Sequence, residues 1–329
     1  MDDKQTIINK YKIAPLIELE DFKCPEGGQS FFLNGFDGKR LRVAIWNINS
    51  EEGTIILQSG RTEFIEKYYE VIEGFILRGY CVAAMDWRGQ GLSERTSKNI
   101  RLGHIDNFEE YDKDLIKTLE LYGALCPKPW IGFGHSMGGC LMASNFVENQ
   151  KDYKGLILCA PMLAIQSRPS LRVIISALGS ISSLGFKDFA IDKPSWDDEK
   201  GWLEEEFNDN FLTSDVYRFN RAYRLISKEH DLGVKGLSLG WIYEAVKRTN
   251  QFKDKNWGNN VEKPSLLLNA TQDRLVSPTG NIQILSRFKN SHVENIDCRH
   301  EIFMESDQIR NRAWKKVDEF LGGLKLKIL

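Results

Sequence analysis

The segment Trp130–Leu141, WIGFGHSMGGCL, holds the residues best suited to chemistry. Its apolar start predicts the end of a buried strand, GHSMG follows, and a helical pattern begins near Gly139. A serine in a G-x-S-x-G turn between a strand and a helix is typical of a nucleophile elbow, which exposes the hydroxyl at the end of a sheet. The pattern therefore predicts that Ser136 acts as a nucleophile.

A serine hydroxyl is a weak nucleophile at neutral pH, so it needs a base, and the base needs an orienting carboxylate. In elbow-type enzymes the chain order is serine, acid, histidine. Four of the five histidines fit this order or position poorly, because they precede the serine, lie in an expected insertion or begin a strand: His104, His135, His230 and His292. The fifth, His300, follows the last expected strand and is the predicted base.

The acid is expected at the end of another strand, and Asp273 lies three residues beyond the strand that ends near Ala270. Asp297 is nearer to His300 in sequence, but it would leave the same strand as the histidine. Asp86 also ends a strand, but it precedes the serine and is better explained as a structural pair with Arg88. We predict the triad Ser136, Asp273 and His300.

Two backbone amides are expected to bind the oxyanion that forms during acyl transfer. The Met137 N–H lies at the start of the helix after the elbow, where amides and the helix dipole favour negative charge. The second donor is expected in the loop after the strand Thr54–Gln58, where Arg61 is the best placed residue. This chemistry requires no metal ion and no organic cofactor.

The elements around these residues alternate between strand and helix, which predicts βαβ units and a mostly parallel, eight-stranded sheet flanked by helices. A helix is expected over Thr62–Leu77, and another opens at Asn107 with Glu110 in a capping box. A C-terminal helix is also expected. The predicted strands are 31–33, 41–47, 54–58, 80–85, 130–133, 155–160, 265–269 and 292–296.

The alternation stops between Pro161 and Trp257, where the pattern is helical and rich in aromatic residues. We interpret 161–257 as a helical cap, or lid, inserted into a core made of 1–160 and 258–329. Val173–Leu184 is its most apolar piece, too short to span a bilayer. Two alternatives stay open for this piece: it lines a slot for an acyl chain or touches a lipid surface, or it is an ordinary cap helix.

Composition excludes some classes of protein. The 329 residues carry a net charge of −2 with a pI near 6.3, which argues against a nucleic-acid partner. No apolar N-terminal signal segment and no membrane-spanning run are expected. The six cysteines are scattered without metal-binding spacing, which favours free thiols in a reducing compartment. These observations predict a cytoplasmic protein, with peripheral contact to the inner face of the membrane left open.

The motifs resemble those of the cap-bearing serine hydrolases that include bacterial lysophospholipases and monoacylglycerol lipases. The similar segments extend from about residue 30 almost to the end of the chain. They are SGRTEFIEKYYE (59–70), DWRGQGLSER (86–95), LGHIDNFEEY (102–111), GHSMGG (134–139), FLTSDVYRF (211–219), LSLGWIYEA (237–245), QDRLVSP (272–278) and CRHEIFME (298–305).

The resemblance implies an α/β-hydrolase fold and hydrolysis of one acyl ester of a single-chain lipid through an acyl-enzyme. Monoacylglycerol lipases usually carry His-Gly-x-Gly-Glu where this chain has Ser59–Glu63, SGRTE, so the lysophospholipase branch is favoured. Monoacylglycerol lipase, a carboxylesterase of small soluble esters and a non-catalytic hydrolase-like binding protein are the alternatives. The expected partner is a lipid or ester substrate.

Overall fold

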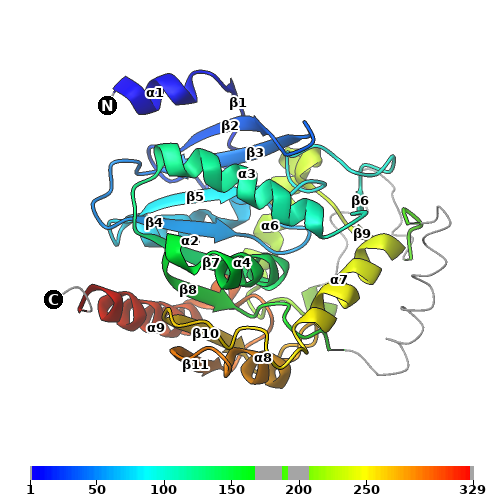
Figure 1. Ribbon diagram of the computed structural model, residues 1–329. Helices are drawn as coiled ribbons and strands as arrows, with labels where there is room; N and C mark the ends of the chain where they lie inside the picture. The colour runs from blue at the N-terminus through cyan, green and yellow to red at the C-terminus, as the bar shows by residue number, and fades with distance from the viewer. Residues whose placement is uncertain (1, 167–186, 192–206, 327–329) are drawn as a thin grey trace. The chain divides into compact units, whose positions relative to one another are not determined.

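The computed structural model describes residues 2–166, 187–191 and 207–326 (Figure 1). These residues form two compact units. The first unit holds 2–128, 187–191 and 222–248, and the second holds 129–166, 207–221 and 249–326. The predicted division into core and cap is a different boundary, and it stays a prediction. Val173–Leu184 lies outside the described residues.

The sheet of the first unit follows the order β1-β2-β3-β5-β4. The pairs β1·β2, β2·β3 and β3·β5 are antiparallel, and β4·β5 is parallel. A separate parallel pair joins β6 to β9. The strands are β1 (Lys12–Ile13), β2 (Gln29–Asn34), β3 (Arg40–Trp46), β4 (Thr54–Gln58), β5 (Cys81–Met85), β6 (Leu102–Gly103) and β9 (Gly236–Leu237).

The helices of the first unit include one that starts later than expected. The predicted helix from Thr62 is a short 3₁₀ turn, η1 (Ile65–Tyr68), followed by α2 (Tyr69–Ile76). Thr62 has a φ of 61°, which a helix does not allow. The others are α1 (Asp2–Ile8), α3 (Glu109–Leu125), the 3₁₀ turn η4 (His230–Leu232) and α7 (Leu239–Gln251), whose end lies in the second unit.

Two buried arginines hold the first unit together, and they correct the predicted pair of Asp86 with Arg88. Asp86 instead accepts a 2.7 Å hydrogen bond from Arg42, which also binds Glu66. Arg88 contacts three other carboxylates: Asp37, which precedes β3, and Glu110 and Asp114, which lie on one helix. Closeness in sequence suggested the wrong pair, because Asp86 binds an arginine from another strand and Arg88 binds carboxylates from other elements.

Arg88 also explains why the expected capping box is incomplete. The side chain of Asn107 accepts a hydrogen bond from the Glu109 amide at 3.0 Å. Glu110, whose carboxylate should accept from the Asn107 amide, instead accepts a hydrogen bond from Arg88 Nη1 at 2.7 Å. The Glu110 carboxylate therefore binds the buried Arg88 guanidinium and not the Asn107 amide, because a charge-assisted hydrogen bond is stronger.

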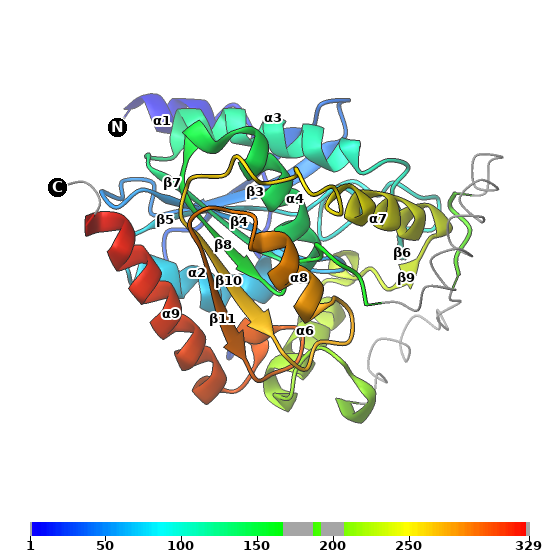
Figure 2. The same cartoon turned by 60° about the horizontal axis from the view of Figure 1, so that its bottom comes forward.

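The second unit has a fully parallel sheet in the order β7-β8-β10-β11 (Figure 2). Helix α4 packs on β7 and β8, α8 on β10, and α9 along β10 and β11. The strands are β7 (Trp130–His135), β8 (Tyr153–Cys159), β10 (Ser265–Ala270) and β11 (Ser291–Ile296). The helices are α4 (Ser136–Glu148), α8 (Pro278–Leu285) and α9 (Asp307–Leu326).

Four 3₁₀ turns or helices complete the described part of the second unit. They are η2 (Gln150–Asp152), η3 (Phe207–Asp209), η5 (Ile302–Met304) and the first part, up to residue 221, of α6 (Val216–Lys228). Helix α6 continues into the first unit.

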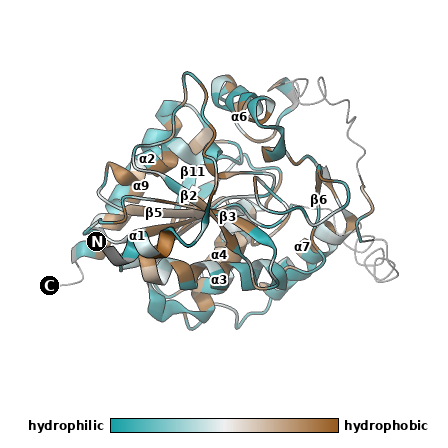
Figure 3. Ribbon diagram, turned by 90° about the horizontal axis from the view of Figure 1, so that it is seen from above, coloured by the Kyte–Doolittle hydropathy of each residue, from teal (hydrophilic) through white to brown (hydrophobic). Residues whose placement is uncertain are grey.

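The cores of both units are built on their strands. Every residue of β4, β5, β7 and β10 is buried, as the continuous apolar runs predict for strands covered on both faces. In Figure 3 helices such as α3 carry hydrophobic and hydrophilic colour together. Among the described helices, none combines the length and the hydropathy that crossing a membrane would require.

All eight predicted strands are present, and the two-residue strands β1, β6 and β9 are additions. The turn predicted between 34 and 38 joins the antiparallel pair β2 and β3. The C-terminal helix is α9, which buries Ala313, Val317 and Leu321 on one face. The predicted α/β class with a mostly parallel sheet is therefore confirmed.

Candidate active site

The elbow around Ser136 is a tight, strained turn. Strand β7 ends at His135, and α4 begins at Ser136 itself rather than near Gly139. Ser136 has a φ of 49°, a left-handed conformation that costs energy for a residue with a side chain. A Cβ on Gly134 would lie 2.6 Å from the Gly139 Cα. Only glycine at position 134 therefore lets the strand and the helix approach this closely.

The Met137 amide lies in the first turn of α4, as predicted for an oxyanion donor. First-turn amides have no acceptor within their own helix, so they are directed out of its N-terminus. The Met137 side chain is fully buried. Burial of the side chain fixes the backbone from which the amide points.

His300 and Asp273, which are 27 residues apart in sequence, form a hydrogen-bonded pair. The His300 Nδ1 atom lies 2.5 Å from Asp273 Oδ2, and both side chains are buried. The other carboxylate oxygen accepts bonds from the Leu275 and Val276 amides at 2.8 and 3.0 Å. Three hydrogen-bond partners therefore hold the carboxylate in one orientation. A carboxylate at Nδ1 favours the tautomer whose Nε2 accepts a proton.

The His300 ring lies beside the elbow. Its centroid is 4.7 Å from that of His135, the residue directly before Ser136, and the ring planes are inclined by 54°. His135 is itself held through Nδ1, which lies 3.1 Å from the Cys159 carbonyl oxygen. The second unit thus brings together the elbow, the histidine and the aspartate that the sequence analysis selected.

Asp297, the rejected alternative acid, is turned elsewhere. Its Oδ1 accepts hydrogen bonds from Thr271 Oγ1 at 3.0 Å and Gln272 Nε2 at 2.9 Å. The bond from Gln272, followed by that from Thr271, lowers the pKa of this carboxyl group. Asp297 therefore has exposed partners of its own.

Arg61, the other predicted oxyanion donor, belongs to the first unit, in a loop held by side chains on both sides. The amide of Gly60 donates to Glu63 Oε2, and the amide of Thr62 donates to Gln90 Oε1 at 2.5 Å. Tyr68 Oη also donates to Glu63 Oε2, at 2.6 Å. The backbone at Arg61 is thereby fixed from both neighbouring residues.

The guanidinium of Arg61 lies over an aromatic ring of α7. Its Cζ atom is 5.2 Å from the centroid of Trp241, within the range of a cation–π interaction. The side chain is thus directed toward α7, a segment that the sequence assigned to the cap.

Two buried carboxylates near these loops were missed by the sequence analysis. Glu63 holds the Gly60 amide, and Glu305 binds the backbone beside His300 through Arg299 N at 3.1 Å. Both lie inside segments that carried the family resemblance, SGRTE and CRHEIFME. The signal was present, but an acidic side chain in a loop is usually solvated, and only the fold reveals which ones are buried.

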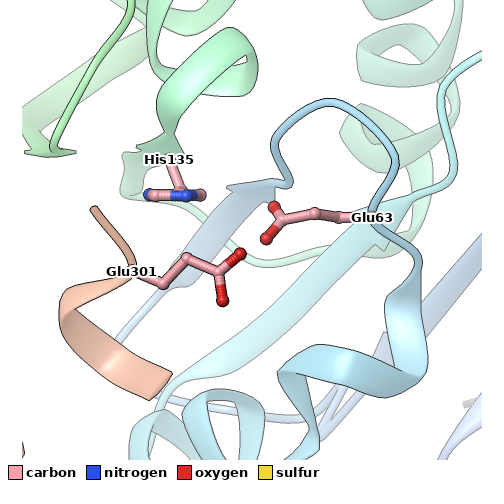
Figure 4. A group of neighbouring side chains, drawn as sticks. All are labelled: Glu63, His135 and Glu301. Carbon is pink, nitrogen blue, oxygen red and sulfur yellow. The ribbon is translucent and has the colours of Figure 1, made fainter. Parts of the chain in front are cut away.

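Figure 4 draws three side chains that could ligate a metal ion: His135 and Glu301 of the second unit, and Glu63 of the first. Within the second unit, His135 and Glu301 offer ligand atoms less than 4.8 Å apart. Catalytic zinc sites use three protein ligands. This pair alone therefore does not make a metal site in the described part of the second unit.

Comparison with known proteins shows the family of this chain. A family model described as serine aminopeptidase, S33, matches residues 49–307, which contain the elbow, Asp273 and His300. The chain belongs to this family. The resemblance predicted from the motifs is confirmed at this level.

Two curated proteins are similar in sequence to this chain over most of its length. A probable lysophospholipase L2 of Haemophilus influenzae is 28% identical over 87% of this chain and 90% of that protein. Lysophospholipase L2 of Escherichia coli K12 is 26% identical over 97% of this chain and 94% of that protein.

A solved structure shows the same fold. A soluble variant of monoglyceride lipase from Saccharomyces cerevisiae, in complex with a substrate analog, superposes with a TM-score of 0.69. It is 19% identical and covers 93% of this chain and 100% of that chain. This chain therefore has the α/β-hydrolase fold.

Proposed function

We propose that this chain hydrolyses the carboxylic ester of a single-chain lipid, as a lysophospholipase-type serine hydrolase. The observation that carries the proposal is the buried His300–Asp273 pair beside the strained elbow serine. Support for the substrate class comes from relatives named lysophospholipase L2, which match nearly the whole chain.

The proposed mechanism is acyl transfer to water in two steps. Ser136 attacks the ester carbonyl while His300 Nε2 takes the hydroxyl proton and then gives it to the leaving alcohol. His300 next takes a proton from a water molecule, whose oxygen attacks the acyl carbonyl. The bond from the carbonyl carbon to Ser136 Oγ then breaks, His300 returns the proton to Oγ, and the fatty acid leaves. Asp273 fixes the tautomer and stabilises the imidazolium. No metal or organic cofactor takes part in these steps.

We assign the oxyanion hole to the Met137 and Arg61 amides. Met137 is supported by its place in the first turn of α4, where amides favour a developing negative charge. Arg61 is supported by its place in the loop after β4, where elbow-type enzymes carry the second donor, and by the bonds that fix Gly60 and Thr62. Each amide is expected to donate one hydrogen bond to the oxygen of the tetrahedral intermediate.

We further propose that 161–257 forms a cap over a core of 1–160 and 258–329.

We also propose that the protein is cytoplasmic with peripheral contact to the inner face of the membrane. Support for membrane contact comes from exposed aromatic side chains in the second unit that lie close to arginines. Phe211 and Tyr217 are 48% and 51% exposed. Arg274 lies 5.4 Å from the Phe211 ring and Arg221 lies 5.8 Å from the Tyr217 ring.

Product analysis after incubation with lysophospholipids, monoacylglycerols and an amino-acid p-nitroanilide tests the proposal. We expect free fatty acid from lysophospholipid, and none from the Ser136→Ala variant. Release of p-nitroaniline instead would favour the peptidase activity in the family's description. Absence of turnover of every substrate would favour a non-catalytic binding protein.

A series of p-nitrophenyl esters tests the lipid preference separately. Each buried methylene contributes roughly 0.8 kcal/mol, so kcat/KM should rise steeply from acetyl to longer acyl chains. A flat profile would favour a hydrolase of small soluble esters. Ile174 and Leu178, which belong to the apolar piece Val173–Leu184, lie outside the described residues, so the series uses the wild-type chain.

A further inference from the structure

The loop that carries His300 is fastened to a segment almost 90 residues earlier in the chain. We call Arg299–Glu305 the histidine loop and Leu212–Ser214 the brace segment. The brace segment precedes α6 and lies in the second unit, as the histidine loop does. On the sequence it falls inside the proposed cap, far from any predicted catalytic residue.

Glu305 is the centre of this attachment, and its side chain is fully buried. Oε1 accepts a hydrogen bond from the Arg299 amide at 3.1 Å. Oε2 accepts from the Ser214 amide at 3.0 Å and from the Ser214 hydroxyl. One carboxylate therefore joins the residue directly before His300 to the brace segment. Charge-assisted bonds of this kind are about twice as strong as neutral ones.

Three further hydrogen bonds, each to a backbone carbonyl, strengthen the attachment on both sides of the histidine. The Glu301 amide donates to the Leu212 carbonyl at 2.8 Å, and Arg299 Nη1 donates to the Thr213 carbonyl at 2.8 Å. Thr213 Oγ1 donates to the Met304 carbonyl at 2.7 Å. The residues before and after His300 are thus both bonded to the brace segment.

We propose that Glu305 is a positioning residue for the base of the reaction. It does not reach the reacting atoms; it holds the backbone of His300, so that the imidazole keeps its place between Asp273 and the elbow. The proposal rests on the proposed function of His300 as the base. A misplacement of about 1 Å can lower a rate by about 100-fold, so a loosened loop should act mainly on kcat.

The test is a double-mutant cycle with p-nitrophenyl acetate on the full chain. Glu305→Gln keeps the shape of the side chain but removes the charge, and it turns an amide NH₂ toward the donors of either Arg299 or Ser214. We expect kcat to fall about 10- to 100-fold with KM within about twofold. In a His300→Ala background the same substitution should cost less than about twofold, because the group it positions is gone.

Additive losses in the cycle would overturn the proposal, because a role in general folding or in another part of the site would persist without His300. An unchanged kcat in Glu305→Gln would overturn it as well. Glu294→Gln is the matched control, since it removes a carboxylate of the same unit that binds Arg312; its kcat should equal that of the wild type.

A second pair of variants keeps the test decisive where Glu305→Gln does not fold. Ser214→Ala removes only the hydroxyl bond to Glu305 and should lower kcat severalfold, whereas Ser214→Thr keeps a hydroxyl and should retain it. Equal activity of the two would overturn the proposal. Failure of the proposed function is seen separately, as a wild type that neither turns over esters nor is labelled at Ser136 by a fluorophosphonate.

Discussion

The Nδ1 atom of His300 lies 2.5 Å from Oδ2 of Asp273, and the second oxygen of that carboxylate is occupied by two backbone amides. The loop after β10 therefore holds the acid through contacts that do not involve the histidine. The contact with His300 distinguishes Asp273 from Asp297, which is closer to the histidine in sequence but is hydrogen-bonded elsewhere.

Replacing Asp273 by asparagine should abolish most activity while the fold is kept. The amide has nearly the shape of the carboxylate but favours the wrong imidazole tautomer, so kcat for a short ester should fall by up to ~10⁴-fold. Asp297→Asn is the control and should lose less than about twofold. The opposite ranking of the two variants, measured with p-nitrophenyl acetate, would show that the acid has been misassigned.

Gly134→Ala should destabilise the elbow. The new Cβ would lie 2.6 Å from the Gly139 Cα and 2.8 Å from the Gly138 carbonyl oxygen, so backbone must move, at a cost of about 1–3 kcal/mol. We expect a lower midpoint of urea unfolding and at least a tenfold loss of kcat.

Gly322→Ala in α9 is the matched control for that variant. A Cβ there meets no atom within 4 Å, and alanine is favoured over glycine in a helix by up to about 1 kcal/mol. The control should be as stable as the wild type or more so, with unchanged kcat. If both alanine variants behaved alike, close approach at the elbow would not explain the glycine.

Glu63→Gln should loosen the loop that carries Arg61. The buried carboxylate binds the Gly60 amide, the Tyr68 hydroxyl and Lys67, and leaving one of these donors unpaired costs about 1–3 kcal/mol. We expect kcat to fall about tenfold. Tyr68→Phe, which removes one of the same bonds, should lose less. A Glu63→Gln enzyme with wild-type kcat would show that the loop needs no such support.

Stability in acid should depend on His104. Burial, the largest influence, lowers the pKa of this imidazole below its ordinary value of 6.5, although Asp106 and Asp188 oppose the shift. As the pH falls through 6.5, His104 therefore binds a proton in the unfolded chain but stays neutral in the folded one. The free energy of unfolding should drop by up to about 1.4 kcal/mol per pH unit below that point from this group.

Urea unfolding of the wild type and His104→Gln at pH 5, 6, 7 and 8 checks this expectation. The variant should show a shallower loss of stability between pH 7 and 5. His292→Gln is the control, because His292 is exposed and its replacement should leave the slope unchanged. A wild-type slope in His104→Gln would assign the acid sensitivity to another group.

The parts of this molecule that follow local rules were predictable. Continuous apolar runs located every central strand, and the order of serine, aspartate and histidine along the chain selected a pair that the fold brings to 2.5 Å. These inferences succeed because strand burial and elbow geometry leave direct marks on residue type and spacing.

Other features depend on partners that sequence does not reveal. The sequence suggested Asp86, a near neighbour, as the partner of Arg88. In the fold Arg88 Nε donates instead to Oδ2 of Asp114, a residue of α3, at 2.6 Å. The start of α2 was placed too early because a threonine at positive φ carries no signal in the residue type. Glu305 was overlooked because its donors, Arg299 and Ser214, meet only after the chain has folded.

The bonds between Leu212–Ser214 and Arg299–Glu305 have a consequence for protein engineering. Caps of hydrolases are attractive units to exchange between relatives in order to change substrate range. In this chain a transplant of 161–257 as one block would also replace the partner of the histidine loop. The exchangeable piece should therefore end before Leu212, or the incoming sequence should supply a hydroxyl at position 214. Chimaeras cut on either side of residue 211 would differ in turnover even if they carried the same acyl-chain preference.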